Sequence, residues 1–176
     1  MSINPQSVRI AVIILLQIIT ILGLTIQKET QIATGQSIFV KLAPLDPRSL
    51  LQGDYVILDY EIANQALAAL DKGAPELLQP KWFFNKVKVV LKSDGPLHTF
   101  KEVHPWHASP TLLPGEIILN AKVYTPHEIL FGIENVFVPE GTGLSVEENA
   151  KFAELKIASN GNALITQLLD TLPSTP

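Results

Sequence analysis

Three of the four histidines lie with an acidic residue in one short stretch, which makes this stretch the best candidate for a metal site. The residues are His98, Glu102, His104 and His107. Imidazole and carboxylate are good zinc or copper ligands, and the last two histidines are close enough in sequence to share one ion across a turn. Their spacing matches no standard motif, so a polar loop in which Trp106 acts as an aromatic plug is the alternative.

Acidic side chains form the second candidate group, because two carboxylates can serve as a general acid and a general base. The candidates are Asp54, Asp59, Glu61, Glu134 and Glu140. Asp54 follows a glycine at the start of an apolar run, where an aspartate commonly accepts hydrogen bonds from its own loop. The chain has no cysteine, which excludes thiolate chemistry and disulfides. The pattern contains no catalytic signature and favours a protein that is not an enzyme.

Arg48 is the only arginine after Arg9 and lies shortly before Asp54. Its planar guanidinium can hold a carboxylate through two parallel hydrogen bonds, and that carboxylate could be Asp46, Asp54 or one from a partner. The whole chain carries 13 basic and 17 acidic side chains, for a net charge of −4. Two arginines in a net acidic chain argue against a phosphate-binding surface, so nucleic acid is not expected as a partner.

Residues 10–27 contain no charged side chain and are nearly all apolar. As a helix this run would reach about 27 Å, close to the hydrocarbon thickness of a bilayer, so we predict a transmembrane helix. Arg9 lies on the short side, whereas Lys28 on the other side is offset by Glu29, and this distribution places residues 1–9 in the cytoplasm. A cleaved signal peptide is the alternative, but its nearest acceptable cleavage site, 33–35, lies well past the apolar run.

Gln17 and Thr20 lie in the middle of this run and three residues apart, hence on one face of the predicted helix. Polar groups at this depth often form hydrogen bonds with a second helix, so this face is a candidate contact with a partner protein. The alternative is that one glutamine and one threonine are simply tolerated in the anchor.

Residues 38–170 are enough for one folded domain, which follows a polar connector over 28–37. Runs of β-branched and aromatic residues, bounded by glycine and proline, predict strands over 38–42, 55–61, 81–92, 117–124 and 129–138. An Asn-Gly pair at 160–161 between two apolar runs predicts a closing hairpin. We therefore expect a mainly β (α+β) class, with an antiparallel domain whose strands could close into a barrel.

Two short helices are expected within this domain. The first covers 62–70, is rich in alanine and leucine, and ends at Gly73. The second covers 146–151, because Ser145 and Glu148 have the spacing of a capping box. The tail over 171–176 is polar and proline-rich, so we expect it to be frayed.

Two predicted strands are preceded by the same sequence pattern, which consists of two leucines, a spacer, a glycine and an acid. The glycine and acid are Gly53 and Asp54 in the first copy and Gly115 and Glu116 in the second. We expect each glycine to adopt a positive φ and each acid to accept hydrogen bonds from the N–H groups of its loop. A duplicated β-barrel would produce this pattern, and so would convergent turn chemistry.

Residues 53–60 read Gly-Asp-Tyr-Val-Ile-Leu-Asp-Tyr and fit every fixed position of the motif after which the GDYXXLXY family is named. The chain resembles this family in its N-terminal apolar run, in residues 46–50, and in residues 131–141. The resemblance implies a bacterial membrane-anchored protein without an established activity that accompanies a multi-pass membrane protein. The fixed motif positions are Gly53, Asp54, Tyr55, Leu58 and Tyr60.

The motif strand is expected to have a core face and an outer face, because its side chains alternate. The core face holds Val56, Leu58 and Tyr60, and the outer face holds Tyr55, Ile57, Asp59 and Glu61. An aromatic and acidic stripe suits a contact surface as well as solvent, so we take Tyr55, Asp59 and Glu61 as a candidate partner surface.

These observations together predict a non-enzymatic accessory or binding domain, anchored in the lipid bilayer of the bacterial inner membrane. The folded domain is expected on the extracytoplasmic side, in contact with a multi-pass membrane protein that the family resemblance supplies. The alternative is an envelope hydrolase or metal-binding protein that uses the stretch from His98 to His107.

Overall fold

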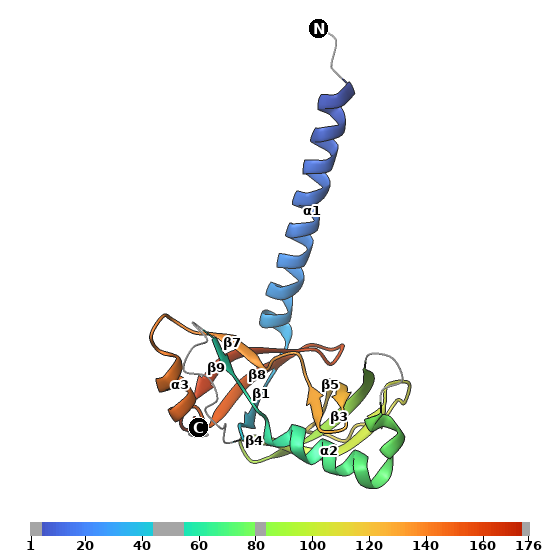
Figure 1. Ribbon diagram of the computed structural model, residues 1–176, viewed down its shortest axis with the longest axis vertical. Coiled ribbons are helices and arrows are strands. Elements are labelled where there is room, and N and C mark those ends of the chain that lie inside the picture. The colour runs from blue at the N-terminus through green and yellow to red at the C-terminus, as the bar shows by residue number, and fades with distance from the viewer. Residues whose placement is uncertain (1–4, 44–54, 80–83, 174–176) are drawn as a thin grey trace. The chain divides into compact units, whose positions relative to one another are not determined.

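The structure is a computed structural model that describes residues 5–43, 55–79 and 84–173 (Figure 1). The chain divides into two compact units, Met1–Gly35 and Gln36–Pro176. The first unit contains one long helix, α1 (Pro5–Thr34). The second contains all the strands and the shorter helices.

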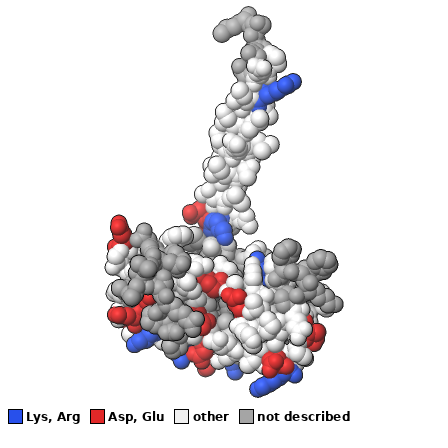
Figure 2. All heavy atoms as spheres, in the orientation of Figure 1, with Lys and Arg blue, Asp and Glu red and all other residues white. Residues whose placement is uncertain are grey.

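Helix α1 is 30 residues long and is apolar enough to span a membrane. Its apolar side chains are exposed along its length, with Ile13 57% and Leu16 64% exposed. Figure 2 shows charged side chains towards the two ends of α1 and an uncharged surface between them. A helix that is apolar on all sides is stable where lipid or protein surrounds it, so this composition suits a membrane span.

The helix continues through residues 28–34, which the sequence analysis assigned to a polar connector. The Thr30 hydroxyl donates to the Ile26 carbonyl at 2.7 Å, and the Thr34 hydroxyl donates to the Thr30 carbonyl at 2.8 Å. Neither glycine nor proline occurs between Gly23 and Gly35, so no residue in this segment breaks the helix. Residues 28–34 of the predicted connector are therefore helical, because polar residues here are compatible with a helix.

Seven strands of the second unit form one sheet that curls into a half-barrel (Figure 1). All neighbouring strands run antiparallel except β1 (Gln36–Lys41) and β4 (Leu97–Pro105), which are parallel. In order across the sheet, the strands are β6 (Glu128–Leu130), β5 (Glu116–Thr125), β3 (Asn85–Asp94), β4 (Leu97–Pro105), β1 (Gln36–Lys41), β8 (Phe152–Ile157) and β9 (Ala163–Leu169). The predicted mainly β domain is confirmed, as is the closing hairpin, which joins β8 to β9.

A second, two-stranded antiparallel sheet pairs β2 (Tyr55–Ile57) with β7 (Asn135–Phe137). The helices of this unit are α2 (Glu61–Gly73), the 3₁₀ helix η1 (Pro75–Leu78) and α3 (Gly143–Asn149). Helix α2 contacts β1, β4 and β6 and buries Ile62, Ala66 and Leu70. The predicted first helix is confirmed.

The core lies between the curled sheet and α2 and is built by strand alternation. In β3, Val87, Val89 and Leu91 are 0% exposed. On the neighbouring strand β5, Leu119 and Val123 are equally buried. Because alternate residues of a strand point to the same face, each strand contributes every second side chain to this core.

Strand β4 was not predicted, because its sequence shows no clear alternation of polar and apolar residues, and in the structure all its residues except the exposed Lys101 are half-buried. Its hairpin partner is β3, and Asp94 pairs with Leu97 across the two-residue loop of Gly95 and Pro96. Gly95 has a φ of +62°, which glycine adopts without strain. The sequence analysis predicted no strand after this turn, so the hairpin of β3 and β4 was missed.

The predicted strand over 129–138 is broken into β6 and β7, which belong to different sheets. Gly132, with a φ of +82°, lies at the break. The predicted capping box was also wrong, because α3 begins at Gly143 and Ser145 lies inside the helix. The Thr142 hydroxyl donates instead to the Pro139 carbonyl at 2.6 Å, so a turn ahead of the helix sets its start.

Candidate functional site

The motif segment enters the domain through β2 and places its second tyrosine in the core. Val56, Leu58 and Tyr60 are 1%, 5% and 1% exposed, which confirms the predicted core face. The Tyr60 hydroxyl donates to the Ile133 carbonyl at 2.7 Å, and its ring meets Phe131 edge to face with centroids 5.9 Å apart. The motif tyrosine therefore joins the motif strand to the segment between β6 and β7.

Burial raises the pKa of the Tyr60 phenol well above its usual range, and the negative charge of Glu134 raises it further. The phenol is therefore neutral at physiological pH and acts as a hydrogen-bond donor. A buried, neutral phenol bonded to a backbone carbonyl supports the fold and is not positioned to react with a ligand.

Glu134 closes the turn between β6 and β7. Its carboxylate accepts hydrogen bonds from the N–H groups of Phe131 and Gly132, the latter at 2.9 Å. Its backbone carbonyl accepts the Leu58 N–H at 2.6 Å, which ties this turn to the motif strand. Glu134, one of the candidate acids, is therefore occupied by backbone donors.

The outer face of the motif segment is partly engaged with its own neighbours. Ile57 is 44% exposed, and Asp59 is exposed while its carboxylate accepts the Tyr60 N–H at 2.8 Å. Glu61 forms an ion pair with Lys41 of β1, with Nζ and Oε2 2.9 Å apart. Tyr55 begins β2, but its side chain lies outside the described residues.

Ile57 and Asp59 line a cleft of about 530 Å³, here called the motif cleft, together with residues of β1, α3 and the start of β8. Its apolar lining includes Val56, Val146 and Phe152, and its charged residues are Lys41, Asp59, Glu147, Glu148 and Lys151. The cleft lining is therefore apolar with charges of both signs. Among the described residues, the lining includes no histidine, serine or threonine.

Sequence reasoning identified the acids at 59 and 61 but missed the basic side of the motif cleft. Lys41 comes from β1 and Lys151 directly precedes β8, so the two meet the motif segment only in the folded chain. The sequence contains no local signal for this arrangement, because the pairing of β1 with β8 is long-range.

The second glycine and acid pair behaves as predicted. Gly115 has a φ of +83°, and the Glu116 carboxylate accepts the Leu113 N–H at 3.0 Å. It also pairs with Lys101 at 2.7 Å. The Leu113 hydrogen bond and then the Lys101 hydrogen bond hold the pKa of Glu116 below its usual range. This residue therefore fixes a loop and is not a free acid.

The first copy of this sequence pattern cannot be compared with the second, because Gly53 and Asp54 lie outside the described residues, as does Arg48. The proposed clamp by Arg48 and the loop-capping role of Asp54 remain predictions. The same holds for the duplicated-barrel interpretation, which depends on both copies.

The histidine stretch forms β4 and the turn after it. Glu102 and His104 lie together, with Oε1 and Nε2 3.4 Å apart. A bulge between Phe100 and Glu102 reverses the strand faces, so His98 faces the side opposite to them. His98 is half-buried, and burial lowers its pKa.

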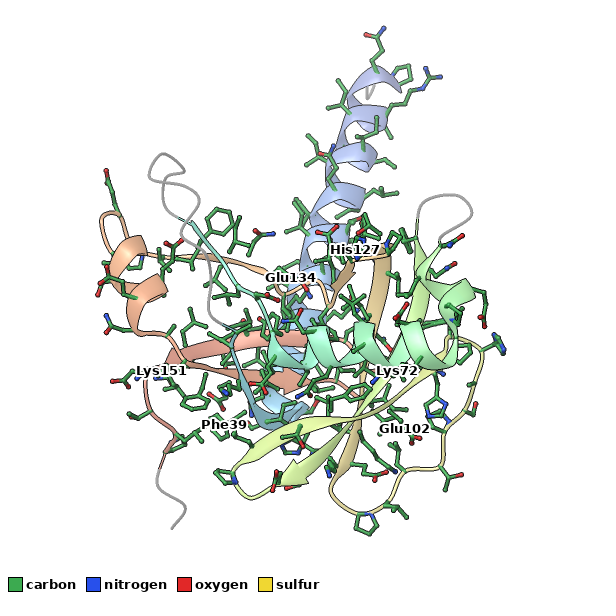
Figure 3. The ribbon with its side chains drawn as sticks, turned by 60° about the horizontal axis from the view of Figure 1, so that its bottom comes forward. Phe39, Lys72, Glu102, His127, Glu134 and Lys151 are labelled. Carbon is green, nitrogen blue, oxygen red and sulfur yellow. The ribbon has the colours of Figure 1, made fainter. Side chains whose placement is uncertain are left out.

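The described residues contain no group of three or more histidine or acidic side chains arranged to hold a metal ion. In Figure 3, His127 lies well away from Glu102. The structure thus brings Glu102 and His104 together without gathering His98 and His107 into a metal site with them.

Trp106 follows β4 in the turn and is 42% exposed, so its ring is not buried in the core. Lys86 and Lys88 of β3 lie over its ring, with Nζ 5.1 Å and 5.5 Å from the centroid. The Lys88 ammonium also donates to the Ala108 carbonyl at 2.7 Å. The tryptophan therefore anchors this turn to the outer face of the sheet through cation–π contacts.

In α1, the two polar residues of the predicted partner face differ in their bonding. The Thr20 hydroxyl donates to the Leu16 carbonyl one turn earlier, at 2.8 Å. The described structure records no such bond for Gln17. Of the two, Gln17 is the residue whose amide is available to a second helix.

Comparison with known proteins gives one match. The profile of the family described as "GDYXXLXY protein" matches residues 17–168, which include most of α1 and nearly the whole folded domain. No curated protein and no solved structure matches the chain. The chain belongs to the GDYXXLXY family.

Proposed function

We propose that this member of the GDYXXLXY family is a membrane-anchored, non-enzymatic accessory domain that binds another, multi-pass membrane protein. One observation carries the proposal. The motif side chains Leu58 and Tyr60 build the core, while their exposed neighbours Ile57 and Asp59 line an open cleft of about 530 Å³. The motif therefore shapes a surface for contact rather than a reactive centre.

The proposed topology has α1 in the bacterial inner membrane, with residues 1–9 in the cytoplasm and the folded domain in the periplasm. Arg9 on the short side of the apolar run supports this orientation. Residues 33–35, the nearest acceptable site for signal peptidase, lie at the end of the helix, where cleavage would remove the anchor from the domain. An uncleaved helix is required for the accessory role.

The proposal predicts that the charge of the motif cleft selects the partner. Lys151 is exposed in this cleft, whereas Lys72 is exposed at the end of α2, and the two lie on different sides of the domain in Figure 3. Lys151→Glu and Lys72→Glu change the net charge equally. Like-charge contacts at an interface are costly, so only Lys151→Glu should reduce partner binding.

The experiment is crosslinking in native membranes, followed by purification of the full-length chain and quantitative mass spectrometry. The expected result is one multi-pass membrane protein in near-stoichiometric yield, reduced about tenfold by Lys151→Glu, as like charges across an interface would produce. Lys72→Glu should leave the yield unchanged. Recovery of no membrane protein above background, or equal recovery with both variants, would refute the proposal.

The membrane-embedded contact is tested separately. Gln17→Leu removes an amide that can bond to a second helix, and membrane hydrogen bonds of this kind are worth about 0.6 to 2 kcal/mol. We expect a severalfold lower yield of the partner. Thr20→Val is the matched control, because the Thr20 hydroxyl is already bonded within α1. If both variants behave like the wild type, α1 serves as an anchor alone.

A further inference from the structure

The two edges of the curled sheet differ in how they are protected. Strand β6 at one edge has three residues, begins with the charged Glu128 and contacts α2. Strand β9 at the other edge has seven residues, 163–169, without a charged residue or a proline. Proteins normally protect a sheet edge with short strands, charges, proline or a covering element, because an open edge pairs with other chains. By these criteria β6 is protected and β9 is open.

Strand β9 pairs with β8 on one side, and within the described residues no strand pairs with its other side. Every second residue of that side presents an N–H and a C=O for a further strand. A bulge near Thr166 divides the edge into two short runs, 163–165 and 167–169. The open edge can therefore receive a short extended segment of another chain.

A groove of about 460 Å³, here called the β7–β9 groove, runs between this edge and β7. Its lining includes both polar and apolar side chains, such as Gln167 and Ile165 of β9 and Asn135 and Val136 of β7. Among the described residues, none that line it carries a charge. A charged occupant would lose hydration there without gaining a counter-ion, so the groove favours an uncharged occupant.

Phe137 of β7 lies at this groove and is 86% exposed. The next residue, Val138, is half-buried and also lines the groove. An exposed large aromatic residue beside an uncharged groove is typical of protein contact surfaces, in which such residues contribute much of the binding energy.

We propose that the β7–β9 groove binds an extended, uncharged segment of the partner protein, which adds to β9 as an eighth strand of the sheet. This inference rests on the proposed accessory function and adds a second contact surface, separate from the motif cleft, together with its recognition mode. Strand addition uses backbone hydrogen bonds for affinity and the groove for side-chain selection. At about 3.3 Å per residue, an edge of seven residues spans roughly 23 Å, so the bound segment has five to seven residues in contact.

The shape of the groove favours a single strand over a second copy of this protein. In a dimer formed edge to edge, the β9 strand of a second copy would arrive with its own β8 beside it. Strand β7 forms the opposite wall of the groove and occupies the space that the β8 strand of the second copy would need. A lone segment has no such neighbour, so it fits between the two walls.

The test places a photoreactive benzoylphenylalanine at Phe137 of the full-length chain in native membranes, which keeps an aromatic ring at the groove. Two variants each add one negative charge while keeping the size of the side chain that is replaced. Gln167→Glu puts the charge in the groove, and Asn64→Asp puts it on an exposed position of α2. Both variants are checked for an unchanged melting temperature, and Asn135→Asp serves as a second groove variant if Gln167→Glu is unstable.

The expected result is an adduct that maps to an uncharged segment of at least five residues in a multi-pass membrane protein. Gln167→Glu should lower its yield about tenfold, because binding would bury an unpaired charge, whereas Asn64→Asp should not. The proposal is overturned by an adduct with a second copy of the chain, by a charged target segment, by equal yields from the two variants, or by no adduct. If Phe137 gives no adduct while Lys151→Glu still releases the partner, the groove inference fails and the accessory function stands.

Discussion

Replacement of Tyr60 by phenylalanine tests how the motif supports the domain. Tyr60 is 1% exposed and its hydroxyl bonds to the Ile133 carbonyl at 2.7 Å. Tyr60→Phe keeps the ring against Phe131 and removes this donor, which leaves a buried carbonyl without its partner. We expect the free energy of unfolding at pH 7 to fall by about 1 to 2 kcal/mol.

The pH dependence gives a sharper expectation. Burial, followed by the charge of Glu134, raises the pKa of the folded Tyr60 phenol, whereas in the unfolded chain it returns to about 10. The stabilisation by the neutral phenol is therefore complete below about pH 10 and is lost at higher pH, by about 1.4 kcal/mol per pH unit. Tyr60→Phe has no phenol and so cannot lose this stabilisation. The unfolding free energies of the wild type and of Tyr60→Phe, plotted against pH, should therefore converge and meet near pH 11.

The assay is urea unfolding of the full-length chain in a nonionic detergent, followed by circular dichroism from pH 7 to pH 11.5. Tyr124→Phe is the matched control, because Tyr124 is 42% exposed and stacks on Phe84. Its curve should run parallel to that of the wild type. Curves for Tyr60→Phe and wild type that stay parallel above pH 10 would show that the fold does not hold this phenol neutral.

Two further substitutions test loops that position the sheet, and a third, in α2, serves as a control. In Gly161→Ala, a Cβ would lie 2.7 Å from Asn120 Oδ1 at a residue with a φ of +83°, so unfolding should become about 1 to 3 kcal/mol easier. In the control Gly73→Ala in α2, the added Cβ meets no atom within 4 Å, so this variant should be more stable than the wild type by up to about 1 kcal/mol. An equal loss of unfolding free energy in Gly161→Ala and Gly73→Ala would refute this reasoning. Glu116→Gln removes a carboxylate whose pKa is held low by Leu113 and Lys101, so wild-type stability should fall as the pH drops below about 4.3 while the variant shows a flatter curve. Urea midpoints measured from pH 3 to pH 7 check this, and identical slopes would contradict it.

Features that depend on local sequence were predictable. The alternation of Val56, Leu58 and Tyr60 indicated the buried face, since a strand exposes every second residue whatever its partners. The role of Glu116 followed from its place after Gly115, because such turns bond their own backbone. The Asn-Gly hairpin was predicted for the same reason.

Features that depend on distant segments were not predictable. The ion pair of Lys41 with Glu61 requires β1 to approach α2, and no local pattern reports that approach. The turn at Gly132 is closed by the Glu134 carboxylate, and the backbone carbonyl of Glu134 also accepts the N–H of the distant Leu58. The open edge at β9 became visible only once the strand order was known.

The most direct test of the central claim, an uncleaved anchor with the domain outside the cytoplasm, uses the absence of cysteine from the chain. Gln6→Cys and Ser159→Cys each supply one thiol, at exposed positions before the apolar run and in the β8–β9 turn. In spheroplasts, a membrane-impermeant maleimide should label Ser159→Cys at once and Gln6→Cys only after permeabilisation, with both chains retained by membranes washed in alkaline carbonate. Protection of Ser159→Cys, or release of the chain by carbonate, would contradict the proposed topology and the accessory role that depends on it.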